Sequence, residues 1–277
     1  MIIDAHCHAG KGDGLSGPWD TEAPIDPYLK RAEESKIART IVFPAFHTDY
    51  AVANREVAAL VARYPRRLWG FAFVHADRDR GRVFDMVQTA VKQYGFLGIK
   101  VHRRDAPISR EICETATYFG LPVLYDVVDE VATIELFARQ YPKVNFIIPH
   151  LGSFGDDWKA QLAITDHLVR HDNIFTDTSG VRRFDLLLHC YKRAGASKII
   201  FGSDGNDDSA SHHPRFMARM TTADSEYGGR AQLEIHGGRE GIGPLGGARR
   251  ARRNTERNAN RDQRRNHLGP HRVRPHQ

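Results

Sequence analysis

The sequence has no long hydrophobic run and little cysteine. No stretch of about 18 consecutive apolar residues occurs, so a membrane-spanning helix is excluded. The first residues, MIIDAHCHAG, hold no basic segment followed by an apolar stretch, which argues against a secretory signal peptide. The three cysteines, Cys7, Cys113 and Cys190, cannot form a disulfide framework and include no Cys-x-x-Cys pair. We therefore expect a protein of the reducing cytoplasm.

Nucleotide-binding glycine motifs are absent as well. No Gly-x-Gly-x-x-Gly follows the first predicted strand, and no glycine-rich loop ends in Lys-Ser or Lys-Thr. Rossmann and P-loop folds therefore lose their main sequence support. What the sequence does hold is 41% apolar residues, which is enough for a packed core and excludes wholesale disorder.

The positive charge is confined to the C-terminal quarter of the chain. The 277 residues include 40 Lys+Arg and 34 Asp+Glu, a formal net charge of +6. Residues 206–277 contain 14 Arg, no Lys and 8 Asp+Glu, which accounts for all of it, whereas residues 1–205 hold 26 of each sign. Only 17 of the 72 residues in 206–277 are apolar, too few to offset the entropy of ordering. We predict a folded body over 1–205 and a disordered basic tail over 206–277.

Two interpretations of this tail stay open. The abrupt change after Gly205 resembles translation of a GC-rich gene in a shifted frame, and it falls where a last helix is expected. Alternatively, runs such as RRARR could neutralise phosphates and bind nucleic acid. Because Phe216 and Tyr227 are the only aromatic residues of the tail and no RNA-binding motif accompanies them, a nucleic-acid partner is not expected.

The body alternates β-rich runs with stretches of helical apolar spacing. Eight strands are predicted, at Ile2–His6, Thr40–Pro44, Leu68–Val74, Leu97–Val101, Pro122–Asp126, Val144–Pro149, Asn173–Thr178 and Lys198–Ser203. Seven helices are predicted between them, at Asp26–Ile37, Asp49–Tyr64, Gly81–Tyr94, Ile108–Phe119, Glu130–Tyr141, Asp156–His171 and Arg182–Ala194. This order predicts an α/β fold, a (β/α)8 TIM barrel with its eighth helix absent or atypical. Functional groups of such a barrel gather at the carboxyl ends of the strands.

The end of the first predicted strand carries two histidines. His6 and His8 share one face because side chains alternate along a strand, and Cys7 points away. Two neutral imidazoles that converge at a barrel mouth make half a site for a divalent metal. A single His-x-His also occurs for structural reasons, so this pattern alone does not establish a metal site.

The fourth predicted strand ends with Lys100 and His102, again on one face. Burial of an unpaired ammonium group is costly, so Lys100 points to a substrate carboxylate, a carbamylated metal ligand or a structural ion pair. Arg103 and Arg104 follow directly and could clamp an acidic substrate. His102 and Arg103, with Lys100, are the predicted substrate-binding residues.

The sixth and eighth strands end in further site candidates. His150 closes the run NFIIPH, and Asp204 follows the apolar run KIIF after Gly-Ser. A carboxylate in that place can hold a metal ion and accept a proton. Among the other strand ends, His47, His75 and Asp177 could face a substrate. The joint pattern of histidines and an aspartate on strands one, six and eight indicates a metal-dependent active site.

These motifs resemble the amidohydrolase superfamily. The Asp-x-His-x-His start, Gly-Ile-Lys-x-His, Pro-His-x-Gly and Phe-Gly-Ser-Asp are similar in order and spacing to its amidohydrolase-related branch, which includes aminocarboxymuconate-semialdehyde decarboxylase-like enzymes. The resemblance covers about residues 1–205. It implies a metal-dependent (β/α)8 barrel in which His6 and His8 are metal ligands, His150 is a catalytic or metal-site residue, and Asp204 is a ligand and proton acceptor.

One position departs from the family pattern. The fifth strand of the family commonly ends Leu-Pro-Val-x-x-His and supplies a further ligand, whereas this chain reads LPVLYD with Asp126 in that place. As a metal ligand, Asp126 would shift the preference for the one divalent ion from Zn toward Mn or Mg. Alternatively, Asp126 orients a ligand histidine.

The resemblance implies hydrolysis of a small ester, lactone or amide by a metal-activated water. In that mechanism His150 stabilises the oxyanion and Asp204 transfers the proton. The alternative is non-oxidative decarboxylation of an aromatic or unsaturated acid on the same metal site. The expected partner is a small-molecule substrate, no membrane is involved, and a homodimer is compatible with the sequence.

Overall fold

A computed structural model describes residues 1–13 and 22–205 of the chain. The predicted tail and the place of the eighth helix, residues 206–277, lie outside the described residues. The disorder and the frameshift proposed for that segment therefore stay predictions.

Eight parallel strands form one continuous sheet in chain order. They are β1 (Ile2–Lys11), β3 (Ile37–Pro44), β4 (Leu68–Phe73), β5 (Gly98–His102), β6 (Val123–Asp126), β7 (Phe146–Ile148), β8 (Ile174–Asp177) and β9 (Ile199–Ile200). A further short strand that the sequence did not predict, β2 (Glu22–Ala23), pairs antiparallel with the end of β1 through Gly10 and Ala23. The predicted strand count and order of the barrel are confirmed.

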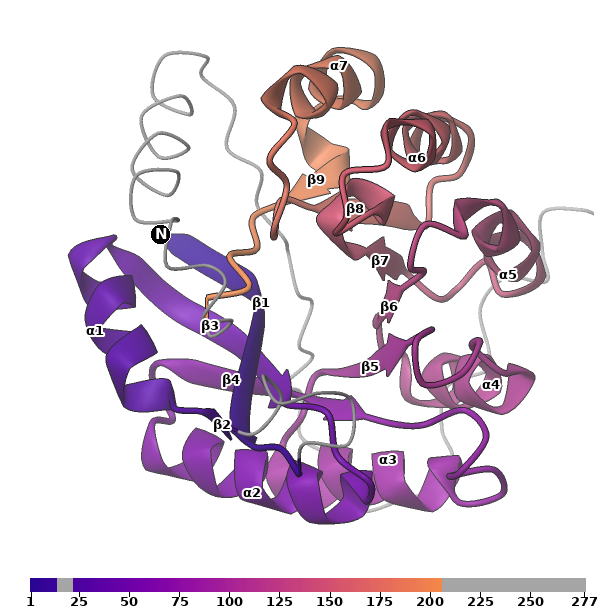
Figure 1. Ribbon diagram of the computed structural model, residues 1–277. Coiled ribbons are helices and arrows are strands. Elements are labelled where there is room, and N and C mark those ends of the chain that lie inside the picture. The colour runs from indigo at the N-terminus through magenta and orange to yellow at the C-terminus, as the bar shows by residue number, and fades with distance from the viewer. Residues whose placement is uncertain (14–21, 206–277) are drawn as a thin grey trace, which may run out of the picture. The chain divides into compact units, whose positions relative to one another are not determined.

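Backbone hydrogen bonds join the last strand to the first. The amide of Ala5 donates to the carbonyl of Phe201 at 2.9 Å, and the amide of Asp204 donates to the carbonyl of His6 at 2.8 Å. These bonds curl the sheet around, as Figure 1 shows, and give a TIM-barrel-like fold. They also bring the first and last strand ends side by side, which places His6 next to Asp204.

Seven α-helices cross over outside the strands (Figure 1). They are α1 (Ile25–Glu34), α2 (Tyr50–Arg63), α3 (Val83–Tyr94), α4 (Arg110–Phe119), α5 (Ile134–Gln140), α6 (Trp158–Arg170) and α7 (Phe184–Ala194). Each begins and ends within a few residues of its predicted range. Side chains fix several starts, since Asp49 accepts from the amide of Ala51, and Asp157 from the amide of Lys159.

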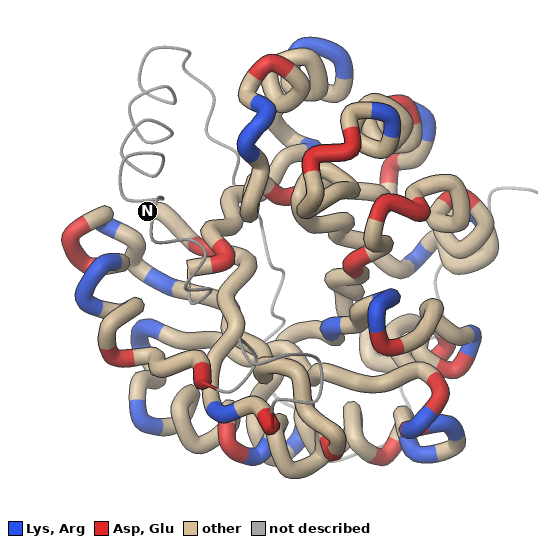
Figure 2. The backbone as a smooth tube through the Cα atoms, in the orientation of Figure 1, with Lys and Arg blue, Asp and Glu red and all other residues tan. Residues whose placement is uncertain are grey.

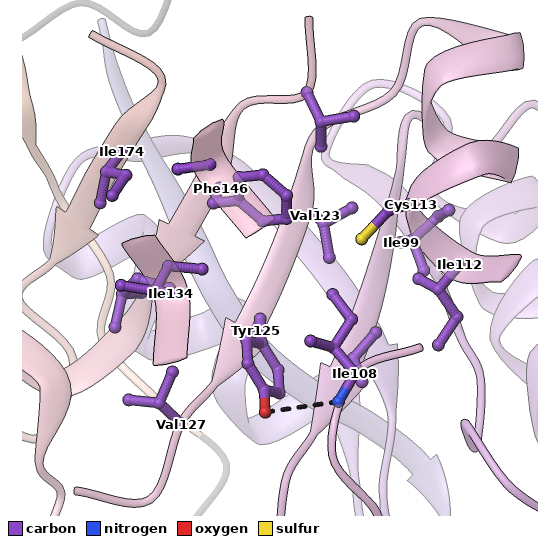
Figure 3. Packing of buried hydrophobic residues seen from close by; sticks show 14 of the residues in the cluster. Ile99, Ile108, Ile112, Cys113, Val123, Tyr125, Val127, Ile134, Phe146 and Ile174 are labelled. Carbon is purple, nitrogen blue, oxygen red and sulfur yellow. Dashed lines mark hydrogen bonds between the residues drawn. The ribbon is translucent and has the colours of Figure 1, made fainter. Parts of the chain in front are cut away.

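The apolar core has an inner and an outer layer. On β6, Leu124 packs inside the ring with residues contributed by strands, whereas Val123 and Tyr125 pack outward against the helices. Figure 3 shows this outer layer, in which the Tyr125 hydroxyl accepts a hydrogen bond from the amide of Ile108 at 3.4 Å. Because both faces of the sheet are covered, the polar groups at its carboxyl end stand out as functional candidates.

Charged residues of both signs are interspersed along the outer helices (Figure 2). Among the residues that the structure describes, none of the helices is long and apolar enough to cross a membrane.

Candidate metal-binding active site

The loops after the strands hold several residues in the left-handed region of the backbone. Val128 (φ 46°), His150 (φ 60°), Leu151 (φ 53°) and Asp204 (φ 54°) all have positive φ angles. Branched and bulky side chains rarely adopt this conformation, and such strain concentrates at functional sites. These turns aim His150 and Asp204 toward the mouth of the barrel.

His6 is fixed by a buried carboxylate. Its Nδ1 lies 2.8 Å from Oδ2 of Asp177 on β8, and both side chains are fully buried. Burial and the charge of Lys100 lower the pKa of His6, while His6 holds the pKa of Asp177 below its usual range against the effect of burial. Since Asp177 is an acceptor, Nδ1 of His6 carries the hydrogen, and its Nε2 presents a lone pair to the barrel mouth.

His8 is oriented in the same way by a backbone carbonyl. Its Nδ1 donates to the carbonyl of Pro44 at 2.8 Å, so its Nε2 carries the lone pair. Its ring meets Phe43 edge-on and stacks on Phe46, with ring centroids 4.6 Å and 5.9 Å away. Burial and Lys100 lower the pKa of His8 well below its usual value, so the imidazole is neutral, as a metal ligand requires.

Asp204 completes a set of three donor groups. Its Oδ1 lies 3.7 Å from Nε2 of His6, and both atoms are buried without a hydrogen-bond partner among the described residues. The donor atoms of His6, His8 and Asp204 all lie within 4.8 Å of one another. Donors that share one zinc ion lie roughly 3 to 3.5 Å apart, so small side-chain movements suffice. The donor set therefore fits a divalent metal ion.

Asp4 locks the two strand ends that carry these donors. Its carboxylate accepts from the Tyr28 hydroxyl at 2.6 Å, from the amide of Ser203 at 2.9 Å and from the amide of His6 at 3.1 Å. The Ser203 hydroxyl donates to it as well. Burial raises the pKa of Asp4 to about 6. Asp4 therefore holds the segment before Asp204 against β1.

Asp126 lies between two histidines. Its Oδ2 is 3.0 Å from Nε2 of His102 and 3.3 Å from Nε2 of His150. His102 Nδ1 accepts from the amide of Arg104, so its Nε2 donates to Asp126. Asp126 is not one of the three residues whose donor atoms cluster around His6.

The surroundings of His150 favour its charged form. Its Nδ1 lies 2.8 Å from the carbonyl of Ser179, and its Nε2 faces Asp126, so both ring nitrogens have an acceptor. Although burial opposes the charge, the hydrogen bond and the charge of Asp126 raise the pKa of His150 to about 9. Burial works against ionisation of Asp126, yet His102 and His150 hold its pKa well below the usual value.

Lys100 lies beneath the site inside the barrel. Its side chain is fully buried, its Nζ has no hydrogen-bond partner among the described residues, and it lies 4.8 Å from the centre of the Phe43 ring. Burial lowers the pKa of Lys100. Its charge in turn favours the neutral forms of His6 and His8.

A cavity of about 500 Å³ opens above these groups. Its lining includes His8, His102, Arg104, Asp126, His150 and Asp204, together with the rings of Phe46 and Phe154. Arg103 is not part of this lining, and its guanidinium lies 3.8 Å from the Glu130 carboxylate. The cavity therefore combines acid–base groups with two apolar rings and one arginine, and Glu22 and Asp129 add further carboxylates to the lining.

The sequence indicated some of these partners and missed others. Asp177 was one of three strand-end residues that could face a substrate, and it faces His6. The carbonyl and hydroxyl of Ser179 bind His150 and Asp177, and no sequence signal marks this serine. Arg104 rather than Arg103 reaches the cavity.

The fold and the groups at its strand ends are those of a metal-dependent barrel enzyme. The sequence matches the family described as Amidohydrolase over residues 3–226, and the chain belongs to this family. Enzymes of this family bind a divalent metal ion, and the three clustered donors fit that property. A search of curated proteins found no match.

Solved structures with this fold catalyse different reactions. An amidohydrolase II shares 20% identity, with 81% of this chain and 93% of that chain covered and a TM-score of 0.62. A probable 2-pyrone-4,6-dicarboxylic acid hydrolase from Acinetobacter baumannii, with citric acid bound, shares 15% identity. The match covers 81% of this chain and 93% of that chain, with a TM-score of 0.60. A dihydroxybenzoic acid decarboxylase from Polaromonas, with bound manganese and an inhibitor, shares 19% identity. The match covers 81% of this chain and 96% of that chain, with a TM-score of 0.54. At these identities the likeness establishes the fold and leaves the reaction open.

Proposed function

We propose that this protein hydrolyses a small ester, lactone or amide, at a site built from His6, His8 and Asp204. The observation that carries the proposal is the pair of unpartnered buried atoms, Nε2 of His6 and Oδ1 of Asp204, which lie 3.7 Å apart, with Asp204 in the lining of the cavity. Buried polar atoms are rarely left without a partner, so this pair points to a cation as the missing component.

One divalent ion would be held by the two imidazoles and the carboxylate, a donor set that suits Zn or Mn. When bound, such an ion supplies Lewis-acid polarisation of a substrate oxygen and makes a nearby water more acidic.

Asp204 carries the proton transfer in this proposal. Its carboxylate lines the cavity, and the left-handed backbone at φ 54° fixes its direction. Asp204 takes the proton of the attacking water and returns it to the leaving group. His150 lines the same cavity in its charged form and stabilises the negative charge on the carbonyl oxygen.

We propose that Asp126 acts as a positioning residue. Its contact of 3.3 Å with Nε2 of His150 supports that role, because it orients this ring and favours its charged form, and its contact of 3.0 Å with His102 fixes Asp126 in turn. Its place outside the His6, His8 and Asp204 cluster supports it over metal ligation.

The cavity suits a small substrate, and Arg104 is placed to bind one acid group of it, next to the carboxylates of Glu22, Asp126, Asp129 and Asp204 in the same lining. A volume of about 500 Å³ falls within the usual range for small-molecule sites. Arg104 in the lining can bind a carboxylate, a role that the sequence suggested for both Arg103 and Arg104. The rings of Phe46 and Phe154 suit an unsaturated or aromatic body.

Decarboxylation of an aromatic acid is the second candidate, and the charged His150 favours it. Loss of CO2 leaves a carbanion that must be protonated, and an imidazolium in the cavity can deliver that proton. The same residues thus serve either reaction.

A product assay on the purified, metal-loaded protein distinguishes the two. Acid release from a panel of lactones and esters is expected, without CO2 release from a matched panel of hydroxybenzoates. CO2 release without acid release would replace hydrolysis by decarboxylation, and inactivity on both panels would overturn the proposal.

A further inference from the structure

A second group of metal-binding side chains lies on the outside of the barrel. Glu135 of α5 faces His167 and His171 at the end of α6, and the three donor atoms lie within 4.8 Å of one another. The Glu135 carboxylate is 3.5 Å from Nε2 of His171 and 3.8 Å from Nδ1 of His167. The two histidines are one helical turn apart, so their rings stack with centroids 6.2 Å apart.

The two imidazoles are in a state that suits metal binding. Nε2 of His171 is buried and has no hydrogen-bond partner within the described part of the chain. The side chain of His167 is 8% exposed, and its Nδ1 accepts a hydrogen bond from Arg170, so this nitrogen carries a lone pair and no hydrogen. Metal ions bind the neutral imidazole.

A positive group already lies against this cluster. The guanidinium of Arg170 is 3.8 Å from Glu135 and 3.3 Å from Nδ1 of His167, which accepts its hydrogen bond. The side chain of Arg170 is 54% exposed, so it can turn into solvent at little cost. The cluster therefore already binds one positive charge, that of Arg170, and binds it weakly enough for a metal ion to replace it.

We propose that Glu135, His167 and His171 form a second metal site, which binds a borderline divalent ion such as Zn²⁺ when Arg170 swings away. Two nitrogens and one oxygen are the donors that zinc prefers, and water can fill the remaining position at the partly exposed Glu135. The two carboxylate oxygens of Glu135 each face one imidazole, Oε1 at 3.5 Å from His171 and Oε2 at 3.8 Å from His167, and small side-chain movements would bring one oxygen within the roughly 3 to 3.5 Å between donors that share a zinc ion.

The role of this second site would be structural and not catalytic. The ligands come from two neighbouring outer helices, α5 and α6, and none of them lines the cavity. A bound ion would join these helices and stabilise the folded protein, because it binds the native state and not the unfolded chain. The rate of catalysis with a loaded active site would be unchanged.

Zinc titration of the metal-stripped full-length chain tests the proposal. We expect Glu135→Gln and His171→Gln to bind one equivalent of Zn²⁺ fewer than the wild type, with unchanged activity and a smaller rise of Tm on zinc addition. Arg170→Gln should bind that equivalent several-fold more tightly, since it removes the competing charge. The six tail histidines (212, 213, 236, 267, 271 and 276) are common to all variants, so any zinc that they bind cancels in the comparison.

Cobalt gives an independent readout of the same site. After the active site is filled, a second equivalent of Co²⁺ should add further visible d–d absorption to the wild type but not to either ligand variant. Equal zinc stoichiometry in the wild type, Glu135→Gln and His171→Gln would overturn the proposal. Weaker binding by Arg170→Gln would overturn the exchange with Arg170.

Discussion

Asp177→Asn should weaken metal binding without touching a proposed ligand. The Asp177 carboxylate only accepts hydrogen bonds. Oδ2 takes one from Nδ1 of His6 at 2.8 Å, and Oδ1 takes those from the amides of His150 and Ser179, each at 3.0 Å. An asparagine has one acceptor oxygen and one donor nitrogen in these two places. One side of the network must therefore change.

The side facing His6 is expected to change. Two backbone amides keep the asparagine oxygen on their side, because leaving buried amides unpaired costs about 1 to 3 kcal/mol each. The asparagine nitrogen then donates to Nδ1 of His6, which moves the imidazole hydrogen to Nε2. His6 then presents a hydrogen instead of a lone pair toward Asp204.

The expected magnitude follows from similar changes around other metal sites. Loss of the residue that orients a ligand histidine typically lowers metal affinity about 10- to 100-fold. The metal-free protein should lose only about 1 kcal/mol in its free energy of unfolding, because every partner stays bonded and only the charge is lost.

Metal titration by calorimetry, with chemical unfolding of the metal-free protein, measures both quantities. Asp172→Asn is the matched control, since this exposed aspartate lies just before the other end of β8. Equal metal affinity in Asp177→Asn and Asp172→Asn would refute the reasoning about the His6 tautomer.

Three further predictions concern other parts of the body. Asp204→Asn should abolish turnover by removing the proton acceptor while the fold persists, which circular dichroism and activity assays check together; retained turnover would contradict it. Gly202→Ala should lower metal affinity, because its Cβ would lie 2.9 Å from Cβ of His6, a contact that forces His6 to move; unchanged affinity would show that the site tolerates the methyl group. Burial raises the pKa of Cys113 to about 12 and of Cys190 to about 11. A thiolate-specific reagent in neutral buffer should therefore label these two cysteines only after denaturation. Rapid labelling of both in the native protein would contradict this prediction.

The barrel could be predicted because its signals are local. Each strand is an apolar run followed by a helix of crossover length, and the bounds of β4 and α4 agree with the predicted ranges within two residues. The alternation within β1 likewise placed His6 and His8 on one side. The short strand β2 carries no such signal, because two residues, Glu22 and Ala23, are too few to show a period.

Side-chain partners beyond the strand ends could not be predicted in the same way. The alternation of β5 stops at His102, so it does not say which of Arg103 and Arg104 reaches the cavity. The contact of Asp126 with two histidines depends on how neighbouring strands align, and β5 places His102 directly beside Asp126 on β6. Such alignment is set by the whole sheet and not by any one motif.

The measurement that tests the central claim most directly is activity on metal titration. Metal-stripped full-length protein should be inactive on the lactone and ester panel and regain activity as Zn or Mn is added. Asp204→Asn should stay inactive at every metal concentration, and His6→Ala should require far more metal. Full activity of the metal-stripped protein, or normal metal-dependent turnover by His6→Ala and Asp204→Asn, would contradict the account.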